Sequence, residues 1–255
     1  MHSKKIHLRT TRNTRDLGGI INREGLRIRE NRLYRSDELS YLSKADAEIL
    51  YHDYNLRVIV DLRNHREMIQ REDVVILDQK YVKNTLLLEG AVGVSHDEET
   101  LKKKEELWLK ANTIAHFAKQ GMENFYREMV DDYGSKMLGN FLKEVLNNED
   151  ATLWHCAIGK DRCGVASAVL LKALDVDDQI IMTDYLYTNH CYSPGYQPKD
   201  TVRDWCDYAH RDYLEVAMAE IDKRYGSFDD FLINGCNFSV EERERLKEKY
   251  LEKQV

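Results

Sequence analysis

The chain has 255 residues, of which 42% are hydrophobic and 33% are charged, with only 2 Pro and 13 Gly. This composition excludes collagen-like, Pro-rich and disordered chains, and the length suffices to bury a core without disulfides. The formal net charge of −7 argues against general nucleic-acid binding. Basic residues gather at the start, where positions 1–35 hold ten Lys or Arg against three Asp or Glu. Such a flank attracts anionic substrates, although a solvated surface explains it equally well.

Two further features of composition bear on location and cofactors. No run approaches the roughly 18 apolar residues of a membrane helix, so we expect no integral membrane segment. The first residues include basic side chains but lack the apolar stretch of a signal peptide. The five cysteines form no Cys-x-x-Cys pair, which favours a reducing compartment and disfavours a metal site. We therefore expect a cytoplasmic protein with no cofactor or metal, and leave open export without a recognisable signal peptide.

The predicted elements alternate between strands and helices over the first two-thirds of the chain. Apolar and β-branched patterns predict strands in four stretches: 16–37, 57–62, 81–88 and 151–155. Helical spacing of apolar residues predicts helices in 44–54, 97–147, 164–174, 180–187, 205–221 and after Ser239. Ser43 is placed to cap the first helix, and breaks in the second are expected near Gly121 and Gly134. Since no repeat or linker divides the chain, we expect one α/β domain over 1–255, with a largely parallel central sheet and helical additions.

The segment after the predicted strand 151–155 contains the most informative motif, Cys-x5-Arg, formed by Cys156 and Arg162. Inward backbone N–H groups at Gly159 and the start of a helix bind anions, so they favour both a phosphate and a thiolate. We therefore expect a lowered thiol pKa and a nucleophilic Cys156. The planar guanidinium of Arg162 can hold two phosphoryl oxygens at once. The alternative is a buried, inert cysteine beside an unrelated arginine.

This loop resembles the active-site signature of the cysteine-dependent protein tyrosine phosphatases. Its His-Cys-x-x-Gly-Lys-Asp-Arg form is similar to that of the bacterial tyrosine/serine phosphatase family, which includes atypical, lipid-active members. The resemblance extends along nearly the whole chain through shorter motifs: Asn13–Gly19, Tyr34–Asp37, Val60–Glu67, Asp184–Leu186 and Tyr225–Ser227. It implies an α/β fold of the three-layer protein tyrosine phosphatase type, with helices on both faces of a largely parallel sheet and extra helices that form a lid.

The resemblance also implies roles for individual residues. Cys156 matches the nucleophile that forms a phosphocysteine, Arg162 the phosphate-binding arginine, and Asp161 an in-loop general acid. Lys160 matches a lysine that lipid-active relatives share. The implied phosphate- and substrate-binding residues are Ala157, Ile158, Gly159, Lys160 and Cys163.

Cys163 departs from the family pattern, which usually has Thr or Ser after the loop arginine. A thiol is a weaker hydrogen-bond donor than a hydroxyl, so we expect the phosphocysteine on Cys156 to break down slowly. Mild oxidation could also join the two cysteines reversibly. The alternative, slightly favoured, is that Cys163 fills a small packed site.

Two aspartates compete for the role of general acid. Asp161 could instead orient a neighbouring basic side chain. Asp61 ends a predicted strand, where ligands bind in open α/β sheets, but pairing with Arg63 is the more favoured interpretation of it. His155 is expected to be a packed residue whose hydrogen bonds shape the loop.

Two other regions have alternative interpretations. Four charged residues of the N-terminal third either reach the rim of the site or form buried ion pairs: Arg15, Asp16, Arg35 and Asp37. Residues 97–147 are expected to form a helical lid or insertion, and their charge-rich first half, 97–119, is otherwise a solvated amphipathic helix.

The leading functional hypothesis is hydrolysis of phosphotyrosine, with phosphoserine and phosphothreonine as further substrates, through a phosphocysteine. The nearest alternative is a phosphoinositide phosphatase with the same loop chemistry, motivated by Lys160 and the basic N-terminal third. A catalytically inactive phospho-binding module is less favoured, because both Cys156 and Arg162 are present. The partner is thus a phosphorylated protein or a phosphoinositide, and not a nucleic acid.

Overall fold

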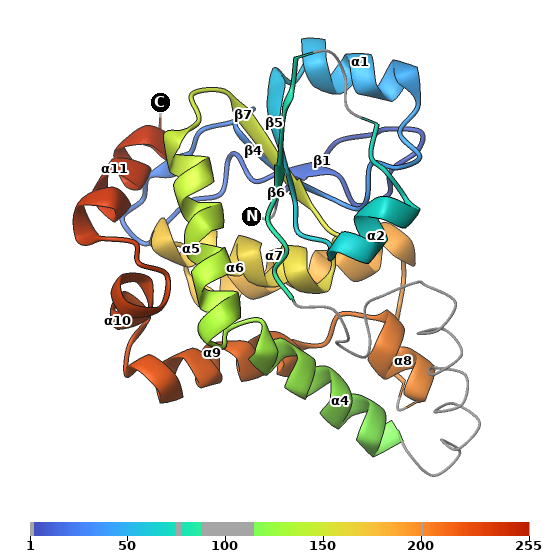
Figure 1. The fold of residues 1–255 in the computed structure, drawn as a ribbon, viewed down its shortest axis with the longest axis vertical. Coiled ribbons are helices and arrows are strands. Elements are labelled where there is room, and N and C mark those ends of the chain that lie inside the picture. The colour runs from blue at the N-terminus through green and yellow to red at the C-terminus, as the bar shows by residue number, and fades with distance from the viewer. Residues whose placement is uncertain (1–2, 75–77, 88–114, 200, 255) are drawn as a thin grey trace.

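A central six-stranded sheet organises the chain, whose computed structural model describes residues 3–74, 78–87, 115–199 and 201–254 (Figure 1). The strands are β1 (Lys4–Lys5), β2 (Arg15–Asp16), β4 (Leu33–Ser36), β5 (Leu56–Asp61), β6 (Lys80–Lys83) and β7 (Ala151–His155). Their order is β1-β2-β4-β7-β5-β6. The last four strands in this order are mutually parallel, and the first two pair antiparallel. A separate ribbon pairs β3 (Arg27–Ile28) with β8 (Leu251–Glu252).

Helices cover both faces of the sheet. They are α1 (Lys44–His52), α2 (His65–Gln70), α4 (Ala115–Glu128), α5 (Asp132–Asn147), α6 (Asp161–Ala173), α7 (Asp178–Tyr192), α8 (Val202–Asp207), α9 (Arg211–Tyr225), α10 (Phe228–Asp230) and α11 (Val240–Tyr250), with a π-helical turn, η2, at Phe231–Gly235. Alternate residues of β7 enter different cores: Leu153 packs in the cluster that includes Leu50 of α1, and Trp154 in the one that includes Phe141 of α5. Because strand side chains alternate between faces, the sheet lies between two helical layers, as in Figure 1.

Most of the predicted elements are confirmed, including the largely parallel sheet. Strand β7 has the predicted bounds, and the Ser43 side chain caps α1 by accepting from the Asp46 N–H. Helix α6 begins at Asp161, three residues earlier than predicted. The predicted helix over 205–221 is wrong, because the chain leaves α8 in an extended conformation at Tyr208 and begins α9 at Arg211.

The predicted helical stretch 97–147 is described only from residue 115 onwards, and 97–114 lie outside the described residues. Helix α4 continues through Gly121 and ends at Glu128. The break between α4 and α5 covers residues 129–131, and the last of these, Asp131, caps α5. Gly134 therefore lies inside a helix and does not break one. Buried residues such as Phe141 and Leu142 pack α5 into the larger hydrophobic core.

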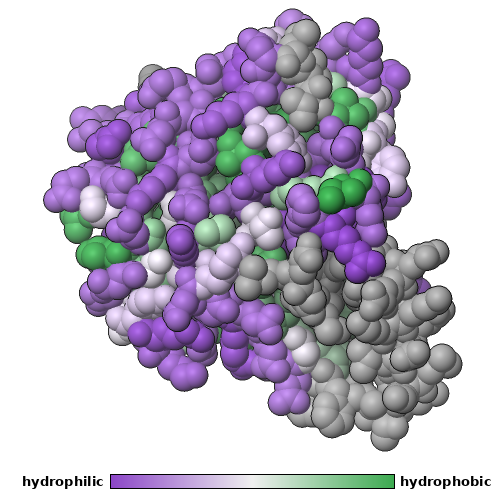
Figure 2. Space-filling view, viewed as in Figure 1, coloured by the Kyte–Doolittle hydropathy of each residue, from purple (hydrophilic) through white to green (hydrophobic). Residues whose placement is uncertain are grey.

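The side of the molecule seen in Figure 2 is mostly hydrophilic, with hydrophobic residues in small separate patches. Among the described residues, no helix combines the length and the apolar character that crossing a membrane requires.

Candidate active site

The Cys-x5-Arg loop connects the C-terminal end of β7 to the N-terminus of α6. In register, His155 of β7 pairs with Ser36 of β4 and Asp61 of β5, so the loop leaves the middle of the carboxyl edge of the sheet. Gly159 turns it with φ +68°, and a Cβ there would lie 2.5 Å from the Ser36 carbonyl oxygen. Only glycine fits this backbone, which directs the loop toward the helix N-terminus.

Cys156 lies on a cavity of about 360 Å³ at this edge. The loop residues Ala157, Ile158, Lys160, Asp161 and Arg162 form part of the lining. The opposite side comes from α7, α8 and the residue that follows α8: Asn189, Tyr192, Ser193, Cys206 and Tyr208. The cavity therefore combines a sulfur nucleophile, an arginine and two tyrosine rings. Gly159 and Cys163 of the predicted binding set do not line it.

The guanidinium of Arg162 forms an ion pair with the carboxylate of Glu67, a residue of α2. Its Nη1 and Nη2 atoms donate to the two carboxylate oxygens at 2.5 and 2.9 Å, and both side chains are 1% exposed. Asn64 orients Glu67, because the two residues form a capping box at the start of α2. The Arg162 Nε is buried and has no hydrogen-bond partner among the described residues. The Nε–H of the guanidinium therefore remains as a donor for an acceptor that is not part of the protein.

The structure contradicts the expected low pKa of the Cys156 thiol. Burial raises this pKa, and the carboxylates of Asp161 and Glu67 act in the same direction. Arg162 and the backbone N–H of Cys163, which donates to the sulfur, oppose the rise. The prediction counted the positive groups of the loop but not the burial of the thiol, which has the largest effect on its pKa, nor the carboxylates of Asp161 and Glu67.

Asp161 and Lys160 interact with the walls of the cavity. Tyr126 of α4 donates to Asp161 Oδ1 at 2.7 Å, and the hydroxyls of Tyr126 and Tyr185 lie 2.6 Å apart. The Lys160 ammonium donates to the Cys206 carbonyl oxygen at 2.7 Å and lies 3.4 Å from Asp161 Oδ1. Lys160 thus joins the loop to α8, and its charge is partly compensated within the protein.

Asp61, the rival for the role of general acid, is fully buried and does not line the cavity. Its carboxylate accepts from the Arg63 Nε at 3.0 Å and Nη2 at 2.7 Å, and from the Tyr81 hydroxyl at 2.5 Å. This is the pairing with Arg63 that was weighed against a catalytic role.

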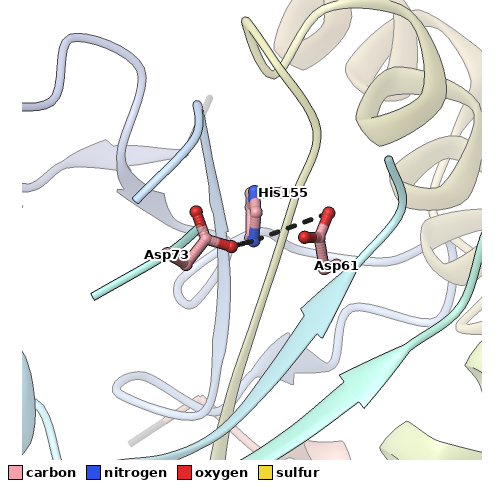
Figure 3. A group of neighbouring side chains, drawn as sticks. All are labelled: Asp61, Asp73 and His155. Carbon is pink, nitrogen blue, oxygen red and sulfur yellow. Dashed lines mark ion pairs between the residues drawn. The ribbon is translucent and has the colours of Figure 1, made fainter. Parts of the chain in front are cut away.

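His155 lies between Asp61 and Asp73 behind the loop (Figure 3). Its Nε2 is 2.9 Å from Asp73 Oδ2, and its Nδ1 is 3.2 Å from the Cys156 carbonyl oxygen. Burial disfavours the charged ring, but the two carboxylates outweigh it and raise the pKa of His155. Within the described residues these three side chains form the group with metal-ligand spacing. Arg63 Nη2 lies 2.7 Å from both carboxylates and already supplies the positive charge there, so we assign no metal to the group.

Cys163 is fully buried at the start of α6. Its sulfur donates to the Trp154 carbonyl oxygen at 3.5 Å, and burial raises its pKa to about 11. This environment supports the interpretation of Cys163 as a packed residue.

The N-terminal segment supports the loop from its outer side. Asn13 Nδ2 donates to the carbonyl oxygens of Ile158 and Gly159, and Arg35 donates to the Gly159 carbonyl oxygen at 2.8 Å. Arg15 and Arg35 both pair with Asp184 of α7, at 3.0 and 2.6 Å, and all three are buried. The arginines are therefore buried ion-pair partners that hold the loop, and not rim residues.

Comparison with known proteins agrees with this geometry. The model of a family described as the tyrosine phosphatase family matches residues 6–252. The chain belongs to this family.

Two curated relatives of the phosphatase are bacterial. A protein of Cupriavidus necator whose name assigns it to the tyrosine-protein phosphatases is 28% identical over 244 residues, which cover 91% of this chain and 84% of the relative. A triple specificity protein phosphatase of Mycobacterium tuberculosis, PtpB, is 25% identical over 237 residues, which cover 80% of this chain and 86% of the relative. The chain is thus a phosphoric monoester hydrolase, and the predicted family and enzyme class are confirmed.

Three residues of the phosphatase site escaped the sequence analysis as functional candidates. Glu67 was noted only as part of a family-like motif, although a capping box after a strand could have placed it near the loop. Tyr126 had only its apolar helical spacing as a signal. Arg12 lines the cavity with an exposed side chain, and only its position beside Asn13 hinted at this.

Proposed function

We propose that this phosphatase hydrolyses phosphotyrosine, and also phosphoserine and phosphothreonine, through a covalent phosphocysteine on Cys156. The observation that carries the proposal is the buried Arg162, whose Nη atoms are bound by Glu67 while Nε is left as a donor beside the cysteine cavity. The backbone N–H groups of residues 157–162 and the N-terminus of α6 support the binding of a phosphoryl group there.

Before the first step, the Cys156 thiol loses its proton to solvent. The thiolate then attacks phosphorus as the bond to the leaving oxygen breaks. Asp161, which lines the same cavity, transfers its proton to that oxygen and becomes a carboxylate. Arg162 and the loop N–H groups stabilise the charge on the three equatorial oxygens. The products are the free alcohol and a phosphocysteine.

In the second step, water attacks phosphorus and the S–P bond breaks. The Asp161 carboxylate accepts a proton from the water, and the thiolate and inorganic phosphate are released. The hydrogen bond from Tyr126 at 2.7 Å holds the Asp161 carboxyl group in place for both proton transfers.

A phosphoinositide is the alternative substrate, because the ammonium of Lys160 lies at the cavity and could bind a further phosphate. The ammonium is bound to the Cys206 carbonyl oxygen and is close to Asp161, however, so it offers a second phosphate less than a free cation would. The same loop would perform the same two steps on either substrate. The sparse cysteines support action in a reducing, cytoplasmic compartment.

The test is hydrolysis of p-nitrophenyl phosphate by the wild type, Cys156→Ser and Cys191→Ser. Removing a nucleophile should lower kcat by roughly 10³ or more, whereas Cys191 is a buried residue of α7 outside the cavity. Rapid quench with ³²P-labelled substrate should trap the label on the wild type but not on Cys156→Ser. Addition of a chelator should leave the activity of the wild type intact. Undiminished turnover by Cys156→Ser would refute the mechanism, and inactivity of all three would favour a binding module.

A further inference from the structure

Arg12 differs from the other charged residues around the cavity. Arg162 is neutralised by Glu67, Lys160 lies beside Asp161, and Asp207 pairs with Arg203 at 3.2 Å. The exposed Arg12 side chain lines the same cavity and has neither an ion pair nor a side-chain hydrogen bond among the described residues. Its positive charge is therefore available to a bound substrate.

The backbone at Arg12 is fixed relative to the phosphate-binding loop. The N–H groups of Arg12 and Asn13 donate to the two oxygens of Asp37 at 2.9 and 3.0 Å. Asn13 Nδ2 in turn donates to the Ile158 carbonyl oxygen, and the Tyr192 hydroxyl donates to the same oxygen at 3.0 Å. The segment and the loop are thus cross-linked by hydrogen bonds, so the backbone of Arg12 has a defined position beside the loop.

We propose that Arg12 binds a carboxylate of a protein substrate, from an Asp or Glu side chain that flanks the phosphorylated residue. This inference rests on the proposed protein phosphatase activity and adds a specificity determinant to it. A single exposed guanidinium matches one carboxylate in charge and hydrogen-bonding geometry.

A multiply phosphorylated lipid headgroup fits this surface less well. It would need several uncompensated cations next to the loop, and Lys160 is bound to a carbonyl oxygen while Arg162 is paired with Glu67. Arg12 alone supplies the free charge among the described lining residues.

The experiment compares two phosphotyrosine peptides that differ only in having Glu or Gln on both sides of the phosphotyrosine. An exposed ion pair changes binding by a modest amount, so the wild type should prefer the Glu peptide by about two- to fivefold in kcat/KM. The preference should arise mainly in KM and should decrease at high salt, because the charges are exposed.

Three variants make the comparison specific. Arg12→Gln should bring the ratio of the two peptides to about one, and Arg12→Lys should keep part of the preference. Arg9→Gln is the matched control, because Arg9 is also exposed, lies three residues upstream and does not line the cavity. It should keep the full preference, and thermal melts should confirm that all three variants are folded.

The outcomes separate this proposal from the proposed function. A wild type that hydrolyses both peptides equally, or a preference that survives Arg12→Gln, overturns the role of Arg12 alone. A wild type that hydrolyses neither peptide but removes phosphate from a soluble inositol bisphosphate overturns both proposals.

Discussion

Replacing Glu67 by Gln tests whether the α2 carboxylate holds the phosphate-binding arginine. The substitution keeps the shape of the side chain but removes its charge and one of the two acceptors that receive the Arg162 bonds of 2.5 and 2.9 Å. Both groups are buried, so water cannot replace the lost interaction. The guanidinium would remain charged with 1% of its side chain exposed and without its carboxylate partner.

The expected loss of stability follows from this burial. Breaking one side of a buried ion pair costs about 3–5 kcal/mol, and the hydrogen bond that the Gln oxygen still accepts recovers about 1 kcal/mol. A net loss of about 3 kcal/mol lowers the Tm by roughly 6–12 °C in a protein of this size. Because Glu67→Gln would let the phosphate-binding Arg162 shift from its position, kcat/KM should decrease by about 10- to 100-fold.

The charge of Glu67 also raises the thiol pKa of Cys156, so Glu67→Gln should lower it. The pH dependence of Cys156 alkylation by iodoacetamide measures this directly and should move to lower pH. Glu252→Gln is the control: Glu252 also pairs with an arginine, Arg27, at 2.6 Å, but the two side chains are 29% and 35% exposed, so the loss should be about 0–1 kcal/mol. Equal Tm values for the two variants, with an unmoved alkylation profile, would refute the reasoning.

Three further predictions concern the loop and its support. Asp161→Asn should lower turnover by roughly 10²–10⁴ on alkyl phosphates and much less on p-nitrophenyl phosphate, whose leaving group needs little protonation; equal losses on both would exclude Asp161 as the acid. Cys163→Ser replaces a thiol that donates to the Trp154 carbonyl oxygen by a stronger donor. Slow phosphocysteine breakdown caused by the thiol predicts a higher turnover and a smaller presteady-state burst, and an unchanged burst would support the packed role of Cys163. Burial raises the pKa of Asp184, but its two arginine partners outweigh burial and lower this pKa in the folded protein. The ionised Asp184 therefore stabilises the folded protein at pH values above its unfolded-state pKa of ~3.9, and this stabilisation is lost as the pH decreases below that pKa. Wild-type Tm should therefore decrease more steeply from pH 5 to pH 3 than that of Asp184→Asn, and parallel curves would contradict the linkage.

The parts of the site that were predictable from sequence are those encoded within a few consecutive residues. Cys156, Asp161 and Arg162 lie in one loop between a recognisable strand and helix, so their proximity follows from local geometry. The capping of α1 by Ser43 was predictable for the same reason. Local hydrogen bonds need no knowledge of the tertiary structure.

The interactions that sequence could not supply join distant segments. Glu67 lies 95 positions before Arg162, and Tyr126 lies 35 before Asp161. Neither pairing follows from periodicity, and the Glu67 carboxylate adds to the rise in the Cys156 pKa that burial causes. The break between α8 and α9 was missed because apolar spacing continues across it.

The support of the loop by Arg15, Arg35 and Asp184 has a consequence for synthesis of the chain. The two arginines emerge from the ribosome early, but their carboxylate partner follows Arg15 by 169 positions. At a synthesis rate of roughly 5–20 residues per second, about 8–34 s pass between the incorporation of Arg15 and that of Asp184. During that interval β2 and β4 lack the charge that allows their arginines to be buried, so the hydrogen bond from Arg35 to the loop carbonyl forms only after α7 is available. The nascent phosphatase should therefore complete the support of its anion-binding loop only after residue 184 has been made.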